Sequence, residues 1–194
     1  MVITMTGNKI RTLVECALLI AMATVLSYIP IFQLPMGGSV TLCGMAPIII
    51  ASYRHGLRWG LFTGFVHSIL QMILGLDNFQ YCTTLAAIAC CLFLDYIIAF
   101  TALGAACLFT RPFRNKMAGW GVGAAVVGLI RYLCSFLSGI LIWGGYAPEG
   151  TPVWIYSLTY NGSYMIPEIL LTTFAVVLVM RVIQRRPKQT GEGA

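Results

Sequence analysis

Charged residues are scarce in this chain of 194 residues. Asp, Glu, Lys and Arg together make up 9% of it, and only six residues are acidic. A soluble domain carries about 25% charged residues and about 45–50% apolar ones. Here 59% of the residues are hydrophobic and the mean hydropathy is +0.86. This composition excludes a soluble globular domain, a disordered chain and a nucleic-acid-binding protein.

The sequence also lacks the motifs of nucleotide-driven and hydrolytic enzymes. It contains no GxxxxGK[ST] loop to hold ATP, no GxSxG or HExxH motif and no CxxC pair. Its seven cysteines and two histidines form no recognisable ligand set, so we expect neither a metal nor a cofactor. A protein of this kind that moves a solute uphill takes its energy from an ion gradient or from another subunit.

Long apolar stretches are what the sequence has in abundance. A membrane-spanning helix needs roughly 20 mostly apolar residues. We therefore predict an all-α integral membrane protein, a compact bundle of six transmembrane helices that forms a single domain over residues 1–194. The predicted helices are 10–30, 41–53, 57–76, 84–109, 117–145 and 156–183, followed by a flexible tail at 187–194. The second is short and contains Pro47, so we expect it to be tilted, kinked or only partly spanning.

Basic residues mark one side of the predicted bundle. Lys and Arg lie at the two ends of the chain and in alternate connections, whereas the connections 30–41, 76–84 and 146–155 contain none. Cytoplasmic loops are enriched in Lys and Arg, so this asymmetry predicts that both termini are cytoplasmic and that the number of spans is even. It also explains the formal net charge of +6 without a nucleic-acid partner.

Ionisable residues inside the predicted helices are the strongest functional candidates, because each costs energy that must be offset. They are Glu15, His67, Asp95, Arg131 and Glu168. Glu15 is expected to reach the membrane surface or to pair with a base, whereas His55 is expected in a solvated turn or at the lipid headgroups. His67 is expected to form a hydrogen bond between helices, with a proton relay as the alternative.

Asp95 stands alone in an apolar run and needs a cation to stay ionised. Two sources of that charge remain open. Arg131 could form an internal ion pair with it, or a cationic ligand could neutralise it. Glu168 could equally take Arg131, which would leave Asp95 free for the ligand.

Two further patterns indicate binding surfaces. Aromatic residues crowd the segment from Trp143 to Tyr164, where Tyr156, Tyr160 and Tyr164 fall on one helical face. Aromatic faces attract organic cations, and the proline-restrained loop 148–152 could cover such a pocket. Ala17 and Ala21 have a small-xxx-small spacing, which serves either internal packing or the docking of a partner helix.

Several stretches resemble the thiamine-specific S-components of energy-coupling factor (ECF) transporters, the ThiT/YuaJ family. The most specific are LPMGGSV at 34–40, Leu94-Asp95-Tyr96, and GTPVWIYSLTYN at 150–161 within the longer stretch 131–164. The resemblance covers nearly the whole chain. It implies six membrane helices in a bacterial plasma membrane and vitamin capture at the outer side. It also implies uptake driven by a transmembrane T-component and two ATPase subunits.

The resemblance also implies roles for individual residues. Asp95 would hold the aminopyrimidine of thiamine, with Tyr96 beside it, and Trp143 would be a pocket wall. The other predicted substrate-binding residues are Tyr156, Asn161, Ser135 and Tyr146, and the predicted docking residues for the T-component are Ala17 and Ala21. The sequence departs from the family pattern at three positions. Ser135 stands where members commonly have a His, and the acid at position 95 is Asp rather than Glu. Some members have a tryptophan in the first outer loop, at a position that corresponds to the neighbourhood of Gly38 here.

The predicted function is therefore that of a non-enzymatic, substrate-binding subunit of a thiamine importer. One alternative is an autonomous proton-coupled carrier of thiamine or a related pyrimidine or thiazole, in which His67 or Asp95 titrates. A small integral membrane enzyme is disfavoured, because His67 has no evident Ser or Cys partner in the sequence.

Overall fold

A computed structural model describes residues 7–34 and 38–185. The six α-helices of this part are α1 (Gly7–Ser27), α2 (Ala46–Leu74), α3 (Leu85–Cys90), α4 (Ala99–Leu103), α5 (Lys116–Leu141) and α6 (Val153–Arg185). Shorter 3-10 helices are η2 (Leu76–Tyr81), η4 (Ala106–Thr110) and η5 (Trp143–Tyr146), and η3 (Cys91–Ile98) is a π-helix. The expected tail at 187–194 lies outside the described residues.

The predicted helical bundle is confirmed, with its segments joined differently. The stretches expected at 41–53 and 57–76 form the single helix α2, which is kinked at Gly56, where φ is 80°. The stretch expected at 84–109 is built from α3, η3, α4 and η4 in succession. Among the described residues, four helical stretches are long and apolar enough to cross a membrane: Gly7–Ser27, Leu85–Leu103, Lys116–Leu141 and Val153–Arg185.

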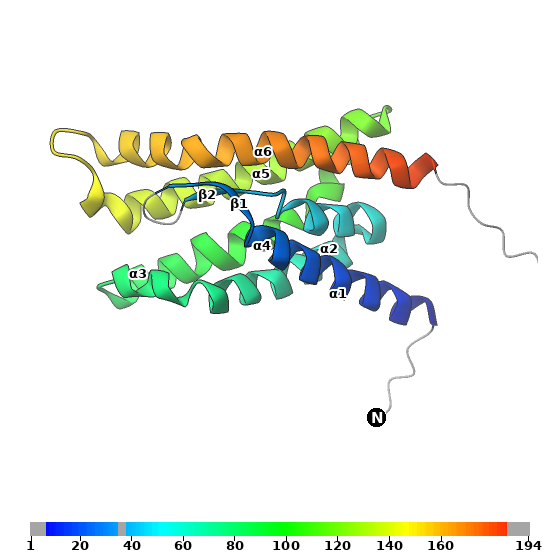
Figure 1. Cartoon of the computed structure of the whole chain (residues 1–194), viewed down its shortest axis with the longest axis horizontal. Helices are drawn as coiled ribbons and strands as arrows, with labels where there is room; N and C mark the ends of the chain where they lie inside the picture. The colour runs from blue at the N-terminus through cyan, green and yellow to red at the C-terminus, as the bar shows by residue number, and fades with distance from the viewer. Residues whose placement is uncertain (1–6, 35–37, 186–194) are drawn as a thin grey trace, which may run out of the picture.

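One element departs from the all-helical expectation. Two short strands pair antiparallel with each other, β1 (Pro30–Gln33) and β2 (Ser39–Thr41). β2 packs against α6, and both strands run along the bundle between α6 and α1 in the view of Figure 1. Backbone groups placed among helices need hydrogen-bond partners, and pairing the two strands supplies them. We refer to the described residues of this segment, 30–34 and 38–41, as the hairpin.

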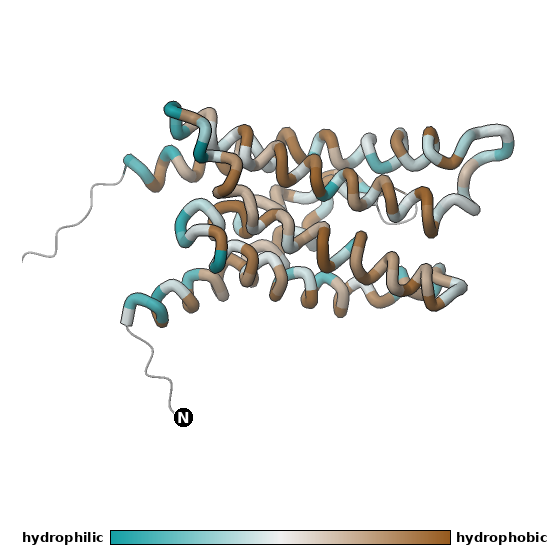
Figure 2. The backbone as a smooth tube through the Cα atoms, turned by 180° about the vertical axis from the view of Figure 1, so that it is seen from behind, coloured by the Kyte–Doolittle hydropathy of each residue, from teal (hydrophilic) through white to brown (hydrophobic). Residues whose placement is uncertain are grey.

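The helices form an elongated bundle whose two described ends lie together. α5 packs against α6 along much of its length, while α1 and α4 both pack against α2 (Figure 1). α1 begins and α6 ends at the same end of the bundle, where hydrophilic residues also gather (Figure 2). Both ends of the described chain thus lie on one side of the bundle, as the positions of Lys and Arg predict. That this side faces the cytoplasm stays a prediction.

The centre of the bundle is the first half of α2. Every residue from Ala46 to Ser52 is buried, and Ile48 and Ile49 are completely inaccessible. The short helix expected to span only part of the membrane is thus the core around which the others pack. Ser52, the last residue of this buried run, connects α2 to the segment after α4. Its hydroxyl donates to the Gly104 carbonyl (2.6 Å) and accepts from the Cys107 N–H (3.1 Å).

Glycines allow the second half of α2 to touch the end of α4 directly. A Cβ atom built on Gly104 would lie 2.1 Å from the carbonyl oxygen of Gly60. No side chain larger than hydrogen fits between two backbones at this distance. The crossing of α2 and α4 therefore depends on these two residues being glycine.

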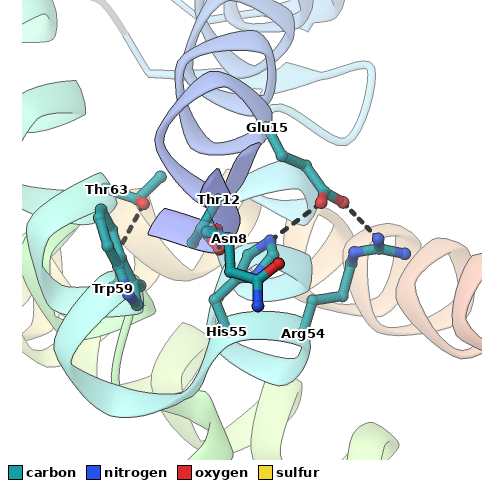
Figure 3. Close-up of polar contacts among 7 residues, drawn as sticks. All are labelled: Asn8, Thr12, Glu15, Arg54, His55, Trp59 and Thr63. Atoms are coloured by element: carbon teal, nitrogen blue, oxygen red, sulfur yellow. Dashed lines mark hydrogen bonds and ion pairs between the residues drawn. The ribbon is translucent and has the colours of Figure 1, made fainter. Parts of the chain in front are cut away.

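Polar groups join α1 to α2 at two levels. Near the end where the chain begins, Glu15 pairs with Arg54 (Oε1 to Nη2, 2.5 Å) and approaches His55 (Oε2 to Nε2, 3.3 Å) (Figure 3). The expectation that Glu15 pairs with a base is confirmed. The expectation that His55 lies in a solvated turn is wrong, since His55 belongs to α2 and its side chain, which contacts Glu15 of α1, is 13% exposed. The alternative position at the lipid headgroups stays a prediction.

Deeper in the bundle, the buried His67 approaches the Thr24 hydroxyl of α1 through Nδ1 (3.4 Å). Its Nε2 lies 3.4 Å from the amide nitrogen of Gln71. These contacts confirm the predicted role of His67 in a hydrogen bond between helices.

Replacing Glu15 with Gln should lower the free energy of unfolding by only about 0.2–1 kcal/mol, because a partly exposed ion pair is screened by solvent. The Glu15 side chain is 29% exposed and that of Arg54 is 31% exposed. Thermal unfolding in detergent measures the change, with Glu149→Gln in an exposed loop as the matched control. A loss of several kcal/mol would contradict this view of the pair.

Candidate ligand-binding site

A cavity of about 290 Å³ lies between the hairpin, η3, α5 and α6. Its lining includes the last residues of α1 and α2, the end of α5 and the start of α6. The end of α2, the end of α5 and the start of α6 lie at the end of the bundle that is remote from both described termini (Figure 1). Ligand pockets in proteins have volumes of about 300–1,000 Å³, so this cavity has room for a small organic molecule.

The carboxylate of Asp95 reaches this cavity from the π-helix η3. The Ser138 hydroxyl of α5 donates to its Oδ2 at 2.6 Å, and the side chains of Cys91 and Trp143 also approach it. π-Turns inside α-helices are frequent at functional sites. Here the π-helix η3 contains Asp95, the acid that the sequence places within a long apolar run.

Arg131 also lines the cavity, and it neutralises neither acid by direct contact. Its guanidinium carbon lies 4.2 Å from the centre of the Phe100 ring. Within the described residues, the ion pairs are those of Glu15 with Arg54 and His55. Glu168 instead accepts hydrogen bonds from Thr41. Arg131 therefore forms a salt bridge with neither Asp95 nor Glu168, and neutralisation of Asp95 by a ligand stays a prediction.

Tyr96 follows Asp95 and forms a fixed part of the wall. Its hydroxyl donates to the Gly75 carbonyl and accepts from the Asn78 amide, both at 2.9 Å. Its ring stacks on Phe79, with the centroids 5.8 Å apart. The residue is 6% exposed, so its orientation is set by these contacts.

The opposite wall is formed where α5 and α6 touch. Gly139 allows this contact, because a Cβ atom there would lie 2.1 Å from Ser157 Oγ. The Asn161 amide donates to the Ser157 carbonyl (2.9 Å), and the Tyr164 hydroxyl donates to Asn161 Oδ1 (2.7 Å). These bonds hold the Asn161 side chain in place beside the cavity.

Aromatic rings line the same side of α6. Tyr156 stacks on Tyr160 at 5.8 Å between centroids, and Tyr160 meets Tyr164 edge to face at 5.9 Å. The prediction that the three tyrosines share one face is confirmed by these contacts. All three line the cavity.

The structure brings six of the seven predicted binding residues to the cavity. Those that line it are Asp95, Tyr96, Ser135, Trp143, Tyr156 and Asn161. Tyr146 does not line it and is 42% exposed; its ring packs on Trp143 (5.9 Å) and on Tyr81 (6.2 Å), behind the wall. The predicted docking residues Ala17 and Ala21 lie on the exposed face of α1, away from the cavity, and so do not serve packing inside the bundle.

The segment beside the cavity is the hairpin rather than the proline-restrained loop. None of residues 148–152 lines the cavity, whereas Gly38, Ser39 and Thr41 do. Sequence reasoning also missed the lining amides of Gln71 and Asn78. The unusual LPMGGSV stretch at 34–40 was the available signal for the hairpin, although its residues 35–37 lie outside the described part.

Comparison of the sequence with models of known protein families identifies the family of this chain. The family model described as "Thiamine transporter protein (Thia_YuaJ)" matches residues 13–188. The chain belongs to the Thia_YuaJ family. Its members are named as transporters, so this chain is a multi-pass cell-membrane protein of a transporter family and not an enzyme.

Individual relatives agree with the family assignment. The chain is 35% identical over 190 residues to "Thiamine transporter ThiT" of Bacillus subtilis, a match that covers 92% of this chain and 95% of that protein. It is 32% identical over 185 residues to the protein of the same name from Lacticaseibacillus paracasei, over 90% and 89% of the two chains. A solved structure of ThiT from Listeria monocytogenes has a similar fold to this chain, with a TM-score of 0.74, 24% identity and coverage of 92% and 98%.

Proposed function

We propose that this chain captures thiamine at the outer face of the cell membrane and delivers it to an ECF-type importer. The observation that carries the proposal is the Asp95 carboxylate, which lines the cavity without a salt bridge to any described residue. The family matches to proteins named as thiamine transporters support the choice of ligand.

The charges around the cavity suit a monovalent cation. Asp95 and Glu168 are acidic and Arg131 is basic, so the ionised side chains of the lining sum to one negative charge. Thiamine carries a fixed positive charge on its thiazolium ring. A cavity shielded from water strengthens the attraction between these charges.

The polar groups suit the other half of the ligand. The aminopyrimidine of thiamine presents an amino donor and ring-nitrogen acceptors. Asp95 can accept from the amino group, while Asn161 and Ser135 offer further polar contacts at the same cavity. Trp143 and Tyr156 provide flat faces for the two rings, as aromatic side chains do for organic cations.

Two features support partner subunits: the missing nucleotide-binding motif, and the face of α1 that points away from the bundle. The sequence has no nucleotide-binding motif of its own, so ATP-driven uptake requires the ATPases of an ECF module. Ala17 and Ala21 leave a shallow strip on the exposed face of α1. Small residues at this spacing allow a second helix to approach closely, and we propose that this helix belongs to the T-component.

Equilibrium binding of thiamine to the purified protein in detergent tests the ligand. Saturable binding with one site per chain is expected, and its absence would refute thiamine capture. Uptake into vesicles tests the coupling, because it should require the T-component, both ATPases and ATP. Uptake driven by a pH gradient in vesicles without ATPases would instead establish an autonomous carrier.

Trp143→Ala should weaken thiamine binding by about 0.5–2 kcal/mol, the contribution of one aromatic face to a cation, or roughly 2- to 30-fold in affinity. Tyr146→Ala is the matched control, since its ring packs on Trp143 outside the cavity. Isothermal titration calorimetry measures both affinities. A larger loss in Tyr146→Ala than in Trp143→Ala would contradict the assignment of the wall.

A further inference from the structure

Glu168 is a buried acid that the binding scheme above uses only for its charge. It lies mid-way along α6, is 2% exposed and lines the cavity. Both of its oxygens are already engaged by one residue. The Thr41 N–H donates to Oε2 (2.5 Å) and the Thr41 hydroxyl donates to Oε1 (2.7 Å). A carboxylate in a membrane bundle is costly, and here two hydrogen bonds from the hairpin offset that cost.

Thr41 passes this contact on to the start of α2. Its hydroxyl oxygen also accepts from the Gly44 N–H at 3.2 Å. A single hydroxyl thus connects α6, the end of β2 and the turn that leads into the buried half of α2. Hydrogen bonds to an ionised acceptor are roughly twice as strong as neutral ones, so Glu168 is the strongest element of this network.

A second contact places the hairpin along the same face of α6. The Gly38 N–H donates to the Tyr160 hydroxyl at 3.1 Å. Tyr160 and Glu168 are eight residues apart, close to two turns of an α-helix, with Tyr164 between them. A Cβ atom on Gly38 would lie 2.7 Å from the Tyr164 ring. β2 therefore lies against α6 between two polar contacts, and only the one at Thr41 involves a carboxylate.

We propose that Glu168 is a positioning residue, which holds the hairpin through Thr41 as a wall of the cavity and so limits the rate at which the ligand leaves. The proposal rests on the proposed function. Asp95 is the acid that meets the ligand, because Glu168 has both oxygens occupied by the hairpin. The lining residues Ser39 and Thr41 stay in place only while this contact holds.

Dissociation of labelled thiamine from the full-length protein, chased with excess unlabelled thiamine, tests the proposal. Glu168→Ala and Thr41→Val should each speed release about tenfold or more, the effect of losing hydrogen bonds to a charged group. Glu168→Ala removes the acceptor of both hydrogen bonds, whereas Thr41→Val removes only the one from the hydroxyl. The double variant should therefore release no faster than Glu168→Ala. Thr41→Ser keeps the hydroxyl and the N–H, so it should behave like the unaltered protein.

Matched variants separate this role from a general loss of folding. Glu149→Ala removes a carboxylate from the exposed loop and should leave the release rate unchanged. Glu168→Gln keeps an acceptor oxygen for Thr41 and should fall between Glu168→Ala and the unaltered protein. Two outcomes would overturn the proposal. In one, the rate effects of the two single changes multiply in the double variant. In the other, Glu168→Ala and Thr41→Val leave the release rate unchanged.

Hydrogen exchange without ligand keeps the proposal separate from the identity of the substrate. In the ligand-free protein, Glu168→Ala should speed exchange of the Thr41 amide, and Thr41→Ser should not. If the unaltered protein binds no thiamine, the proposal of thiamine capture fails. The contact between Glu168 and Thr41 can still be tested, because exchange of the Thr41 amide is measured without ligand. If thiamine binds but the Thr41 amide exchanges equally fast with and without Glu168, the positioning role fails alone.

Discussion

Asp95→Asn should remove most of the affinity for thiamine, with an expected loss of about 2–5 kcal/mol, the usual effect of truncating one partner of a buried charge pair. The change keeps the size of the side chain and an oxygen for the Ser138 hydroxyl, which lies 2.6 Å from Asp95 Oδ2. It removes the negative charge, so the cavity lining becomes neutral in sum. Calorimetric titration of thiamine measures the loss directly.

The control for this experiment is another acid on the same side of the bundle. Glu149 is exposed in the loop before α6 and does not line the cavity. Glu149→Gln removes one negative charge as well, and its thiamine affinity should match that of the unaltered protein. Similar affinities for Asp95→Asn and Glu149→Gln would show that the ligand is held elsewhere.

Gly104→Ala should cause the second large effect, on stability rather than binding. The new methyl group would lie 2.1 Å from the Gly60 carbonyl oxygen, and neither partner is a side chain that can turn away. The backbone at Gly104 is helical, with φ −68° and ψ −11°, so alanine brings no conformational strain of its own. Overpacking of this kind costs about 1–3 kcal/mol, and thermal unfolding in detergent should show a clearly lower midpoint.

Gly121→Ala is the matched control for the helix crossing. A Cβ atom at Gly121 would lie 3.5 Å from a methyl group of Val177, which is ordinary van der Waals contact. Alanine also favours a helix over glycine by up to about 1 kcal/mol. Its unfolding midpoint should equal or exceed that of the unaltered protein. Equal midpoints for the two alanine variants would mean that α2 and α4 can separate without cost.

Hydropathy predicted which residues are helical and could not tell lipid from protein as their surroundings. The stretch 41–53 was expected to span only part of the membrane, and Ala46–Ser52 proved to be the most deeply buried part of the bundle. An apolar run has the same composition in either setting. The kink at Gly56 lies at the boundary predicted between 41–53 and 57–76, where the helix bends rather than ends. No residue pattern predicted the π-turn at 91–98.

The candidate site was predictable where a residue type alone carried the argument. An isolated acid in an apolar run identified Asp95, and ring spacing identified the tyrosine face of α6. The choice between Arg131 and a ligand as the partner of Asp95 needed distances. Prolines around 148–152 indicated a restrained loop without indicating where it lies, which is why the hairpin was missed as the segment beside the cavity.

The π-turn that carries Asp95 has a consequence for the whole helical stretch 85–110. Each residue of an α-helix advances the chain by about 100°. Winding this stretch as a regular α-helix with all of its residues kept would rotate its two halves against each other by roughly 100° or more. Either the carboxylate would face away from its present neighbours, or Gly104 would lose its alignment with Gly60. The wider winding at 91–98 therefore lets Asp95 and Gly104 both face their present neighbours within one helical stretch.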